Sequence, residues 1–360
     1  MLRGAGPWGP GPYKLVEGFA IPNKMTDQVV LEANRDYWNP ERFPRLNRII
    51  FDNTLGQKDA VELVKTAEGR VDLVSELSPL ETLRVAQSPF AKVVKNRGSL
   101  TTVFGLFNMR RAASPWRDVR LRQAVNVAIN REDLIRYAAK GNGVIIPALV
   151  PPQGFGYNPD LAPYPFDPGK ARQLFREAGY PDGLSITLSA PEALVIQATV
   201  VGKMLEQVGL RVDLQILDPT ALYQKINLGF LEQLPEKQSW DIALVPWYDF
   251  VGNFPIYPFY QNFALNGQFD WVIEQPELQQ LYEQALRTVQ RETQQALIRQ
   301  MERHTHEQAY FLFLYNPIKL YAVNKAVEFV PHVTTILNLT ETSVTDQHWS
   351  VRKQKAAVQE

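Results

Sequence analysis

One run of residues, 167–183, carries the marks of a helix with both of its ends defined. Asp167 can accept hydrogen bonds from the free N–H groups at the start of a helix. Gly179 favours the left-handed conformation that ends a helix, and Pro181 prevents the helix from resuming. The apolar residues of 184–188 then alternate as those of a strand do. The run therefore predicts a helix–turn–strand unit, and it holds no chemically reactive group.

Apolar residues recur with helical or strand spacing through most of the chain. In the first block, residues 1–104, the spacing predicts strands at 29–31, 48–51 and 71–74 and a helix at 59–68. In the second block, residues 105–316, it predicts helices at 118–140, 192–207, 219–230, 276–288 and 291–308, and strands at 210–217 and 241–247. Strands that alternate with helices imply right-handed crossovers and a largely parallel sheet. The predicted fold class is α/β.

Composition and charge exclude several classes of protein. The chain has 360 residues, which is enough for two or three domains. Its 38 basic and 38 acidic residues give a net charge of zero, which argues against nucleic acid or an anionic membrane as the main partner. It has no cysteine, so disulfides, thiolate nucleophiles and cysteine metal sites are excluded. No apolar run is long enough to span a bilayer, and residues 1–8 lack the apolar core of a secretory signal peptide.

Several short motifs follow one another in a characteristic order. They lie at 11–15, 34–38, 107–108, 118–124, 128–132, 167–183, 240–244 and 246–247. In this order and spacing they resemble the peptide/nickel class of ABC-transporter substrate-binding proteins, which includes the dipeptide and oligopeptide receptors. The resemblance extends from about residue 11 to about residue 329. The ordered set is specific to the family, but it identifies no ligand within it.

The resemblance implies a two-lobed, hinged fold of the periplasmic-binding-protein type II kind, in which the first lobe is discontinuous. Residues 1–104 are expected to form the middle segment of the first lobe, and 105–316 the second α/β lobe. Residues 317–360 are expected to return to the first lobe and end in a tail. The near-continuous apolar run at 311–323 predicts a buried strand that crosses between the lobes. The N-terminal segment of the family's first lobe has no counterpart here, so that lobe is expected to be incomplete.

The resemblance also implies a function. The chain is expected to be the solute-binding component of an ABC importer, which captures peptides or a related small solute in an inter-lobe cleft and delivers them to a membrane permease. We expect a monomer without enzymatic activity or cofactor, located in the periplasm or on the outer side of a membrane. Two alternatives stay open: a cytosolic ligand-sensing module, which the missing signal segment favours, and an inactive, truncated remnant of such a receptor.

The main candidate binding residues are Trp247, Tyr248 and Asp249, because they follow a predicted parallel strand. Open α/β sheets bind ligands beyond the carboxyl ends of their strands. In peptide-binding members of the resembled family, an aromatic residue followed closely by aspartate holds the peptide at this place, and the carboxylate pairs with the α-ammonium group. Asp249 is the candidate for that charge-assisted hydrogen bond and Trp247 for a wall of the cleft. The alternative for Asp249 is a turn residue in a surface loop.

Phe107 and Asn108 form a second candidate site, because their strand matches the inter-lobe crossover of the resembled family. The backbone of such a strand can present hydrogen bonds to an extended ligand. The alternative for Asn108 is a role in the hinge.

Two other kinds of chemistry have little support in the sequence. His304 and His306 lie two residues apart, so on the predicted helix they point about 200° apart and would not share a metal ion. A hydrolase with paired carboxylates would need Asp218 and Asp241 to lie close together. For Asp241 we favour a role in stabilising the fold.

Overall fold

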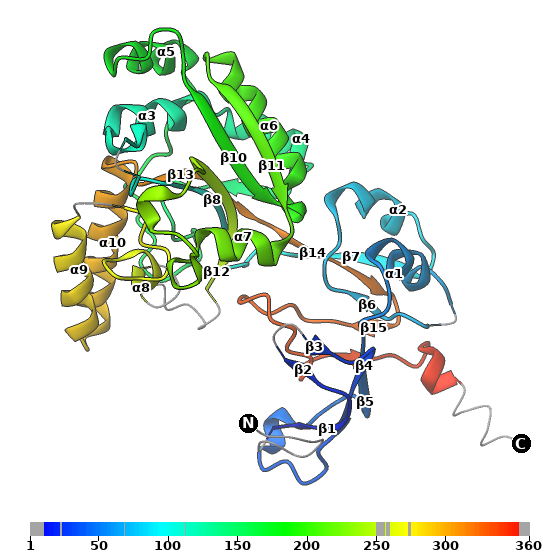
Figure 1. The fold of residues 1–360 in the computed structure, drawn as a ribbon. Coiled ribbons are helices and arrows are strands. Elements are labelled where there is room, and N and C mark those ends of the chain that lie inside the picture. Colours follow the sequence, from blue (N-terminus) through cyan, green and yellow to red (C-terminus); the bar gives the residue numbers. More distant parts are fainter. Residues whose placement is uncertain are drawn as a thin grey trace, which may run out of the picture. The chain divides into compact units, whose positions relative to one another are not determined.

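The structure, a computed structural model, describes residues 11–21, 24–67, 69–111, 113–249, 256, 260–272 and 275–352. The chain divides into two compact units (Figure 1). Unit 1 consists of residues 1–96, 319–332 and 336–360, and unit 2 of residues 97–318 and 333–335.

A six-stranded sheet organises unit 2, with the strand order β11–β10–β12–β8–β13–β9. Its strands are β8 (Thr101–Phe107), β9 (Gly143–Ile145), β10 (Ser185–Pro191), β11 (Arg211–Leu217), β12 (Ile242–Tyr248) and β13 (Phe311–Pro317). Only the pairs β10–β11 and β10–β12 are parallel; β8 pairs antiparallel with β12 and β13, as β13 does with β9. The prediction of a largely parallel sheet was therefore wrong. Parallel neighbours need a crossover connection, and here helices supply it only between β10, β11 and β12.

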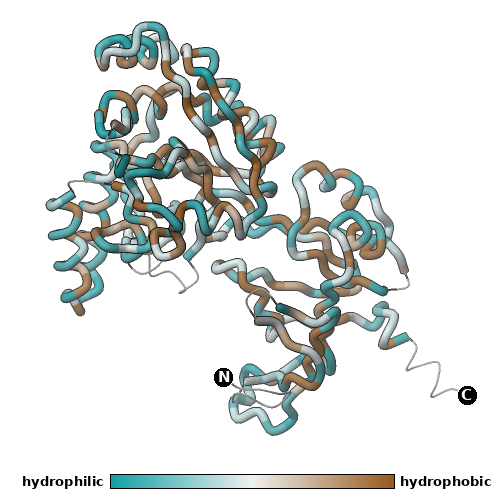
Figure 2. The backbone as a smooth tube through the Cα atoms, viewed as in Figure 1, coloured by the Kyte–Doolittle hydropathy of each residue, from teal (hydrophilic) through white to brown (hydrophobic). Residues whose placement is uncertain are grey.

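Helices cover the sheet of unit 2, and most of them match a predicted segment. They are α3 (Val119–Ala128), α4 (Arg131–Ala138), α5 (Pro168–Glu177), α6 (Val195–Gln207), α7 (Pro219–Ile226), α8 (Gln261–Phe263), α9 (Pro276–Arg287) and α10 (Arg291–Glu307). The predicted segment 118–140 is a pair of helices, because Ile129 is extended and Asn130 caps the start of α4. Figure 2 shows hydrophobic residues along the strands between these helices, where the core lies.

The predicted helix–turn–strand unit is confirmed. The Asp167 carboxylate accepts a hydrogen bond of 2.8 Å from the backbone N–H of Lys170, at the start of α5. At the other end Gly179 has φ +93°, and the N–H of Tyr180 donates to the carbonyl of Phe175 at 2.9 Å. This is the hydrogen bond that closes a helix whose last turn reverses into the left-handed conformation. The strand β10 begins at Ser185.

The apolar run at 311–323 forms two strands rather than one. Residues of β13 pair with β8 and β9 in unit 2, and β14 (Lys319–Asn324) pairs with two strands of unit 1. The break between the two strands falls after Pro317, which has no N–H to donate to a ladder.

Unit 1 is built from small antiparallel sheets. One has the order β1–β4–β5, formed by Tyr13–Glu17, Gln28–Ala33 and Arg48–Asp52. A second has the order β6–β14–β7, in which Leu73–Val74 and Ala91–Asn96 flank β14. Two-stranded pairs are formed by β2 (Ala20–Ile21) with β3 (Lys24–Met25) and by β15 (Val327–Glu328) with β16 (Ser343–Val344). Its helices include α1 (Gln57–Val64), which is shorter than the predicted 59–68, and α2 (Thr82–Ala86).

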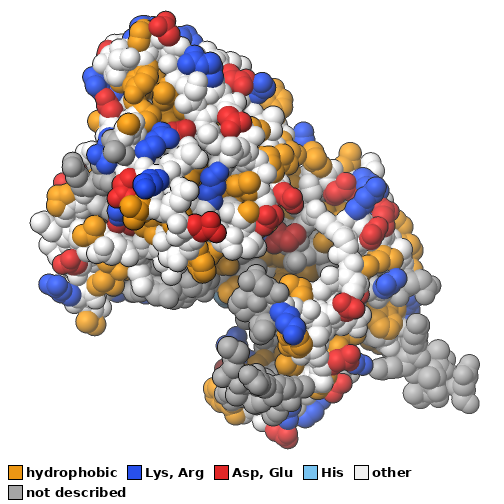
Figure 3. Space-filling model, viewed as in Figure 1, with side chains coloured by type: hydrophobic (Ala, Val, Ile, Leu, Met, Phe, Trp, Pro, Cys, Tyr) orange, Lys and Arg blue, Asp and Glu red, His pale blue; other side chains and the backbone are white. Residues whose placement is uncertain are grey.

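Charged side chains of both signs are interspersed on the face shown in Figure 3. This agrees with the zero net charge of the sequence. Within the part of the chain that the structure describes, no helix is long and apolar enough to cross a membrane.

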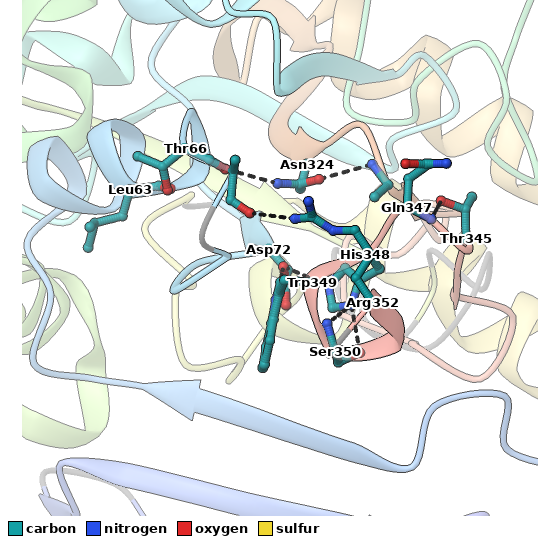
Figure 4. Close-up of polar contacts among 12 residues, drawn as sticks. Leu63, Thr66, Asp72, Asn324, Thr345, Gln347, His348, Trp349, Ser350 and Arg352 are labelled. Atoms are coloured by element: carbon teal, nitrogen blue, oxygen red, sulfur yellow. Dashed lines mark hydrogen bonds and ion pairs between the residues drawn. The ribbon is translucent and has the colours of Figure 1, made fainter. Parts of the chain in front are cut away.

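The last described turn of the chain is bound to the segment that follows α1 (Figure 4). The Asp72 carboxylate lies 3.0 Å from Nε2 of His348 and accepts a 3.3 Å hydrogen bond from the Trp349 indole. Arg352 donates to the carbonyl of Ala67 at 3.3 Å. The Trp349 ring lies directly over Gly69, whose φ is +63°. Gly69 thus supplies both a left-handed conformation and the space for the indole.

We expect Gly69→Ala to destabilise the chain strongly, because the added Cβ would overlap the Trp349 ring and would also sit in a left-handed conformation. The two costs together amount to roughly 2–5 kcal/mol of unfolding free energy. Urea denaturation followed by circular dichroism measures this loss. The control is Gly179→Ala, which has a positive φ but open space at its Cβ and should lose only about 1–2 kcal/mol.

A double variant separates the two costs. Adding Trp349→Ala to Gly69→Ala removes the overlap, so the combined loss should be smaller than the sum of the single losses. Additive losses would show that Trp349 does not occupy this space in solution.

Candidate functional site

A pocket of about 670 Å³ lies at the carboxyl end of β12, within unit 2. One wall consists of the last three residues of β12, Pro246, Trp247 and Tyr248. A second wall comes from the segment 261–269, and α7 and α9 each add one tyrosine. The volume is in the range of small-molecule sites. The pocket lies beyond the carboxyl end of a sheet strand, the place where open α/β sheets bind ligands.

The lining of the pocket combines aromatic rings with carboxamides. The aromatic residues are Tyr223, Trp247, Tyr248, Phe269 and Tyr282. The carboxamides are Gln261, Asn262, Asn266 and Gln268. Among the residues that the structure describes, none that lines the pocket is charged. The arrangement can offer flat apolar faces together with neutral hydrogen-bond donors and acceptors.

Trp247 is held in place by other aromatic rings. Its ring centroid lies 4.9 Å from that of Phe269, with the planes at 77°, and 5.5 Å from that of Phe263. Phe263 in turn packs edge-on against Phe104 and Phe311 in the core. Apart from the tilted Trp247–Phe263 pair, these are the favoured edge-to-face geometries of aromatic pairs. The indole is therefore a fixed part of the wall, anchored to the core of unit 2.

The structure separates the three neighbouring candidate residues. Trp247 and Tyr248 line the pocket, and Tyr248 is 47% exposed. Asp249 is 2% exposed and is not among the lining residues. Its backbone N–H donates to the carbonyl of Leu100 at 3.1 Å, which fastens the end of β12 to the start of β8.

Phe107 and Asn108 lie at the opposite end of the sheet ladder. Tyr248 pairs with Thr101 of β8, whereas Phe107 pairs with Ile242. Six strand residues correspond to roughly 20 Å. Phe107 is 1% exposed, and Asn108 is fully buried, where its side chain donates to the carbonyl of Trp240 at 3.0 Å. The structure does not bring these two residues to the pocket.

Asp241 and Asp218 have structural partners and lie at different levels of the sheet. Asp241 accepts from Arg111 at 2.7 Å and from the N–H of Thr187 at 2.9 Å. Asp218 caps α7 by accepting from two N–H groups of its first turn, both at 3.0 Å. Because β11 ends opposite Pro191 of β10, Asp218 is displaced from Asp241 by roughly 15 Å along the strands. The two carboxylates therefore do not form a pair.

The two histidines of α10 face different partners. Nδ1 of His304 lies 3.3 Å from a carboxylate oxygen of Glu277, and Nδ1 of His306 lies 2.8 Å from the carbonyl of Pro147. Among the described residues, no group of three side chains could hold a metal ion.

The turn that carries the pocket carboxamides is fixed by Asp270. This fully buried carboxylate forms an ion pair with Arg110. It also accepts from the N–H of Asn266 at 3.0 Å and from the amide of Gln275 at 3.1 Å. Three donors thus converge on one carboxylate, which pre-organises the turn containing Asn266 and Gln268.

A buried glutamate supports the other end of the same wall. Glu302 of α10 is 1% exposed and accepts from the Tyr260 hydroxyl and, at 2.9 Å, from the N–H of Val150. Tyr260 immediately precedes α8, whose residues line the pocket. Burial raises the pKa of Glu302 from 4.5 to about 7. No sequence motif identified Glu302, since a glutamate on an amphipathic helix has the pattern of a surface residue.

The raised pKa of Glu302 predicts a pH-dependent stability. Between pH 4.5 and about 7 the folded chain holds a proton on Glu302 that the unfolded chain releases, so unfolding becomes easier as the pH rises. Relative to Glu302→Gln, the wild-type chain should lose roughly 3 kcal/mol of unfolding free energy from about pH 4 to about pH 8. Urea denaturation across this range measures the difference. A difference independent of pH would contradict the burial of an ionisable Glu302.

Comparison with known proteins finds a matching family model and several relatives. The model of the bacterial extracellular solute-binding proteins, family 5 Middle, matches residues 3–292. A glutathione-binding protein, GsiB from Salmonella choleraesuis, is 28% identical over 217 residues, which cover 59% of this chain and 40% of that protein. A dipeptide-binding protein of Escherichia coli is 28% identical over 184 residues, which cover 51% and 32%. The chain thus spans about two fifths or less of the length of these curated relatives.

Solved structures share the fold. The periplasmic binding protein DppA from Helicobacter pylori, in complex with the peptide STSA, superposes with a TM-score of 0.76 at 20% identity. The superposition covers 93% of this chain and 62% of that one. The α/β fold class predicted from the sequence is therefore confirmed.

Proposed function

The chain belongs to family 5 of the bacterial extracellular solute-binding proteins, and we propose on this basis that it is the solute-binding component of an ABC importer. It would capture a peptide, or a related small solute, outside the cytoplasm and present it to a membrane permease. One observation carries the proposal: the family match extends over a pocket of ligand size at the end of a sheet strand.

The proposed assignment of lobes follows the chain order. Residues 1–104 and 317–360 would form one lobe, and 105–316 the other. The division into units supports it, because unit 2 is built mainly from residues 97–318. In this assignment the pocket belongs wholly to the second lobe.

Trp247 and Tyr248 are proposed as the side chains that contact the ligand. Both line the pocket, and the Trp247 ring is fixed by its aromatic neighbours. A rigid ring loses little conformational entropy when a ligand binds, so it contributes its contact area at low cost. Phe107 and Asn108 are left out of this proposal because they are buried at the far end of β8.

Thermal unfolding with a mixed library of di- to hexapeptides tests the function. A ligand at about 100 times its Kd stabilises the native state by roughly 2.7 kcal/mol, which raises Tm by roughly 5–10 °C for a domain the size of unit 2. Trp247→Ala and Tyr248→Ala should remove most of the shift. Tyr137→Ala is the matched control, since Tyr137 is a 56% exposed tyrosine of α4 outside the pocket. No shift with any peptide would contradict a peptide-binding function.

The role of Asp249 stays a prediction, and we propose to test it separately. If its carboxylate pairs with the α-ammonium group of the ligand, acetylation of the peptide N-terminus should weaken binding to the wild-type chain. Asp249→Asn should bind free and acetylated peptides alike. Because Asp249 is 2% exposed, the ion pair would be shielded from water, and its loss should cost about 2–5 kcal/mol of binding free energy. Isothermal titration calorimetry measures the affinities of the wild-type chain and of Asp249→Asn for each peptide. Equal affinities of the wild-type chain for the free and the acetylated peptide would exclude this role.

A further inference from the structure

We propose that the pocket at the end of β12 is a specificity site that accepts an uncharged side chain of the bound peptide and excludes carboxylate and ammonium side chains. This inference rests on the proposed peptide-binding function and adds the class of side chain that the pocket selects.

The first argument is the absence of charge among the lining residues within the described part of the chain. The residues that line the pocket are aromatic, carboxamide or apolar. In the sequence from 242 to 269, Asp249 is the sole charged residue, and it is buried outside the lining. The acidic residues that flank this stretch, Asp241 and Asp270, are already paired with Arg111 and Arg110. A charged ligand group in the pocket would find no opposite charge among the lining residues that are described, and desolvating an unpaired charge is strongly unfavourable.

The second argument is the chemistry that the lining does provide. Each carboxamide offers both donors and acceptors, so Gln261 and Gln268 can satisfy a neutral amide or hydroxyl. Trp247 and Phe269 offer aromatic surface to an apolar or planar group. A neutral polar group in the pocket can therefore exchange its hydrogen bonds with water for hydrogen bonds with protein at little net cost.

The third argument is that the backbone turn carrying Asn266 and Gln268 is held in place. Asp270 fixes the turn from which Asn266 and Gln268 reach the pocket, through its bonds to Arg110, to Gln275 and to the N–H of Asn266. If this wall were mobile, a charged side chain from elsewhere could move next to the ligand. A fixed wall keeps only its uncharged groups in contact with the ligand. Because this turn is pre-organised, the neutral lining stays in place when a ligand binds. The pocket can therefore discriminate between neutral and charged side chains.

Glutamine and glutamate form the sharpest probe, because their side chains have almost the same shape and differ in charge at neutral pH. The experiment uses alanine tripeptides in which one position is Gln, Glu, Lys or Phe, with each of the three positions tested in turn. Calorimetric titration of the full chain at pH 7.5 gives the Kd values. At one position we expect the Gln and Phe peptides to bind at least tenfold more tightly than the Glu and Lys peptides.

A charge introduced into the wall should redirect the selectivity. Gln268→Lys places a cation at the pocket, and we expect it to bind the Glu peptide at least tenfold more tightly than the wild-type chain does, while the Lys peptide binds no better. The control is Gln173→Lys, which changes the net charge equally on the exposed side of α5, away from the pocket. It should leave the order of affinities unchanged.

The outcomes separate the inference from the function on which it rests. Binding of all the peptides with similar Kd at every position would overturn the inference and leave the peptide-binding function standing. Discrimination that Gln268→Lys does not alter would place the selectivity elsewhere in the protein and would also overturn it. No binding of any peptide would overturn both.

Discussion

The antiparallel pairing of β8 with both β12 and β13 is the constraint on which unit 2 depends. β8 receives hydrogen bonds on both edges, so its register fixes two other strands at once. In this ladder Tyr248 lies opposite Thr101. One residue further on, the hydrogen bond from the Asp249 N–H to the Leu100 carbonyl ends the pairing of β12 with β8. The position of Trp247 and Tyr248 in the pocket wall is therefore set by the register of β8 at the centre of the sheet. Moving either residue would require breaking the β8 ladder.

Two buried arginines bind helices of unit 2 to neighbouring segments through backbone carbonyls. Arg122 and Arg131 are 4% and 2% exposed, and their guanidinium groups donate to backbone carbonyls. Burial lowers the pKa of each to about 10, so both stay charged at neutral pH. A single side chain, that of Arg131, donates to the carbonyl of Phe313 in β13 and to that of Asn126 in α3. A guanidinium can serve several acceptors at once, which lysine cannot do in the same geometry.

The sequence identified the elements that carry local signals and missed the groups whose partners are distant. Asp167 and Gly179 marked the ends of α5 because caps act on neighbouring residues. Glu302 gave no such signal, since its partners Tyr260 and Val150 lie 42 and 152 residues away. For the same reason the position of Trp247 at a strand end was predictable, whereas the ladder that separates Phe107 from Tyr248 was not.

The splitting of residues 311–324 into β13 and β14 has a consequence for synthesis on the ribosome. β14 is the central strand of the β6–β14–β7 sheet, and β13 lies between β8 and β9. Both strands are synthesised after all the strands with which they pair. Until then β6 and β7 lack the strand that joins them, and an edge of β8 stays open to other chains. The nascent protein therefore exposes these strand edges to aggregation until one short stretch, residues 311–324, has been synthesised and completes two sheets.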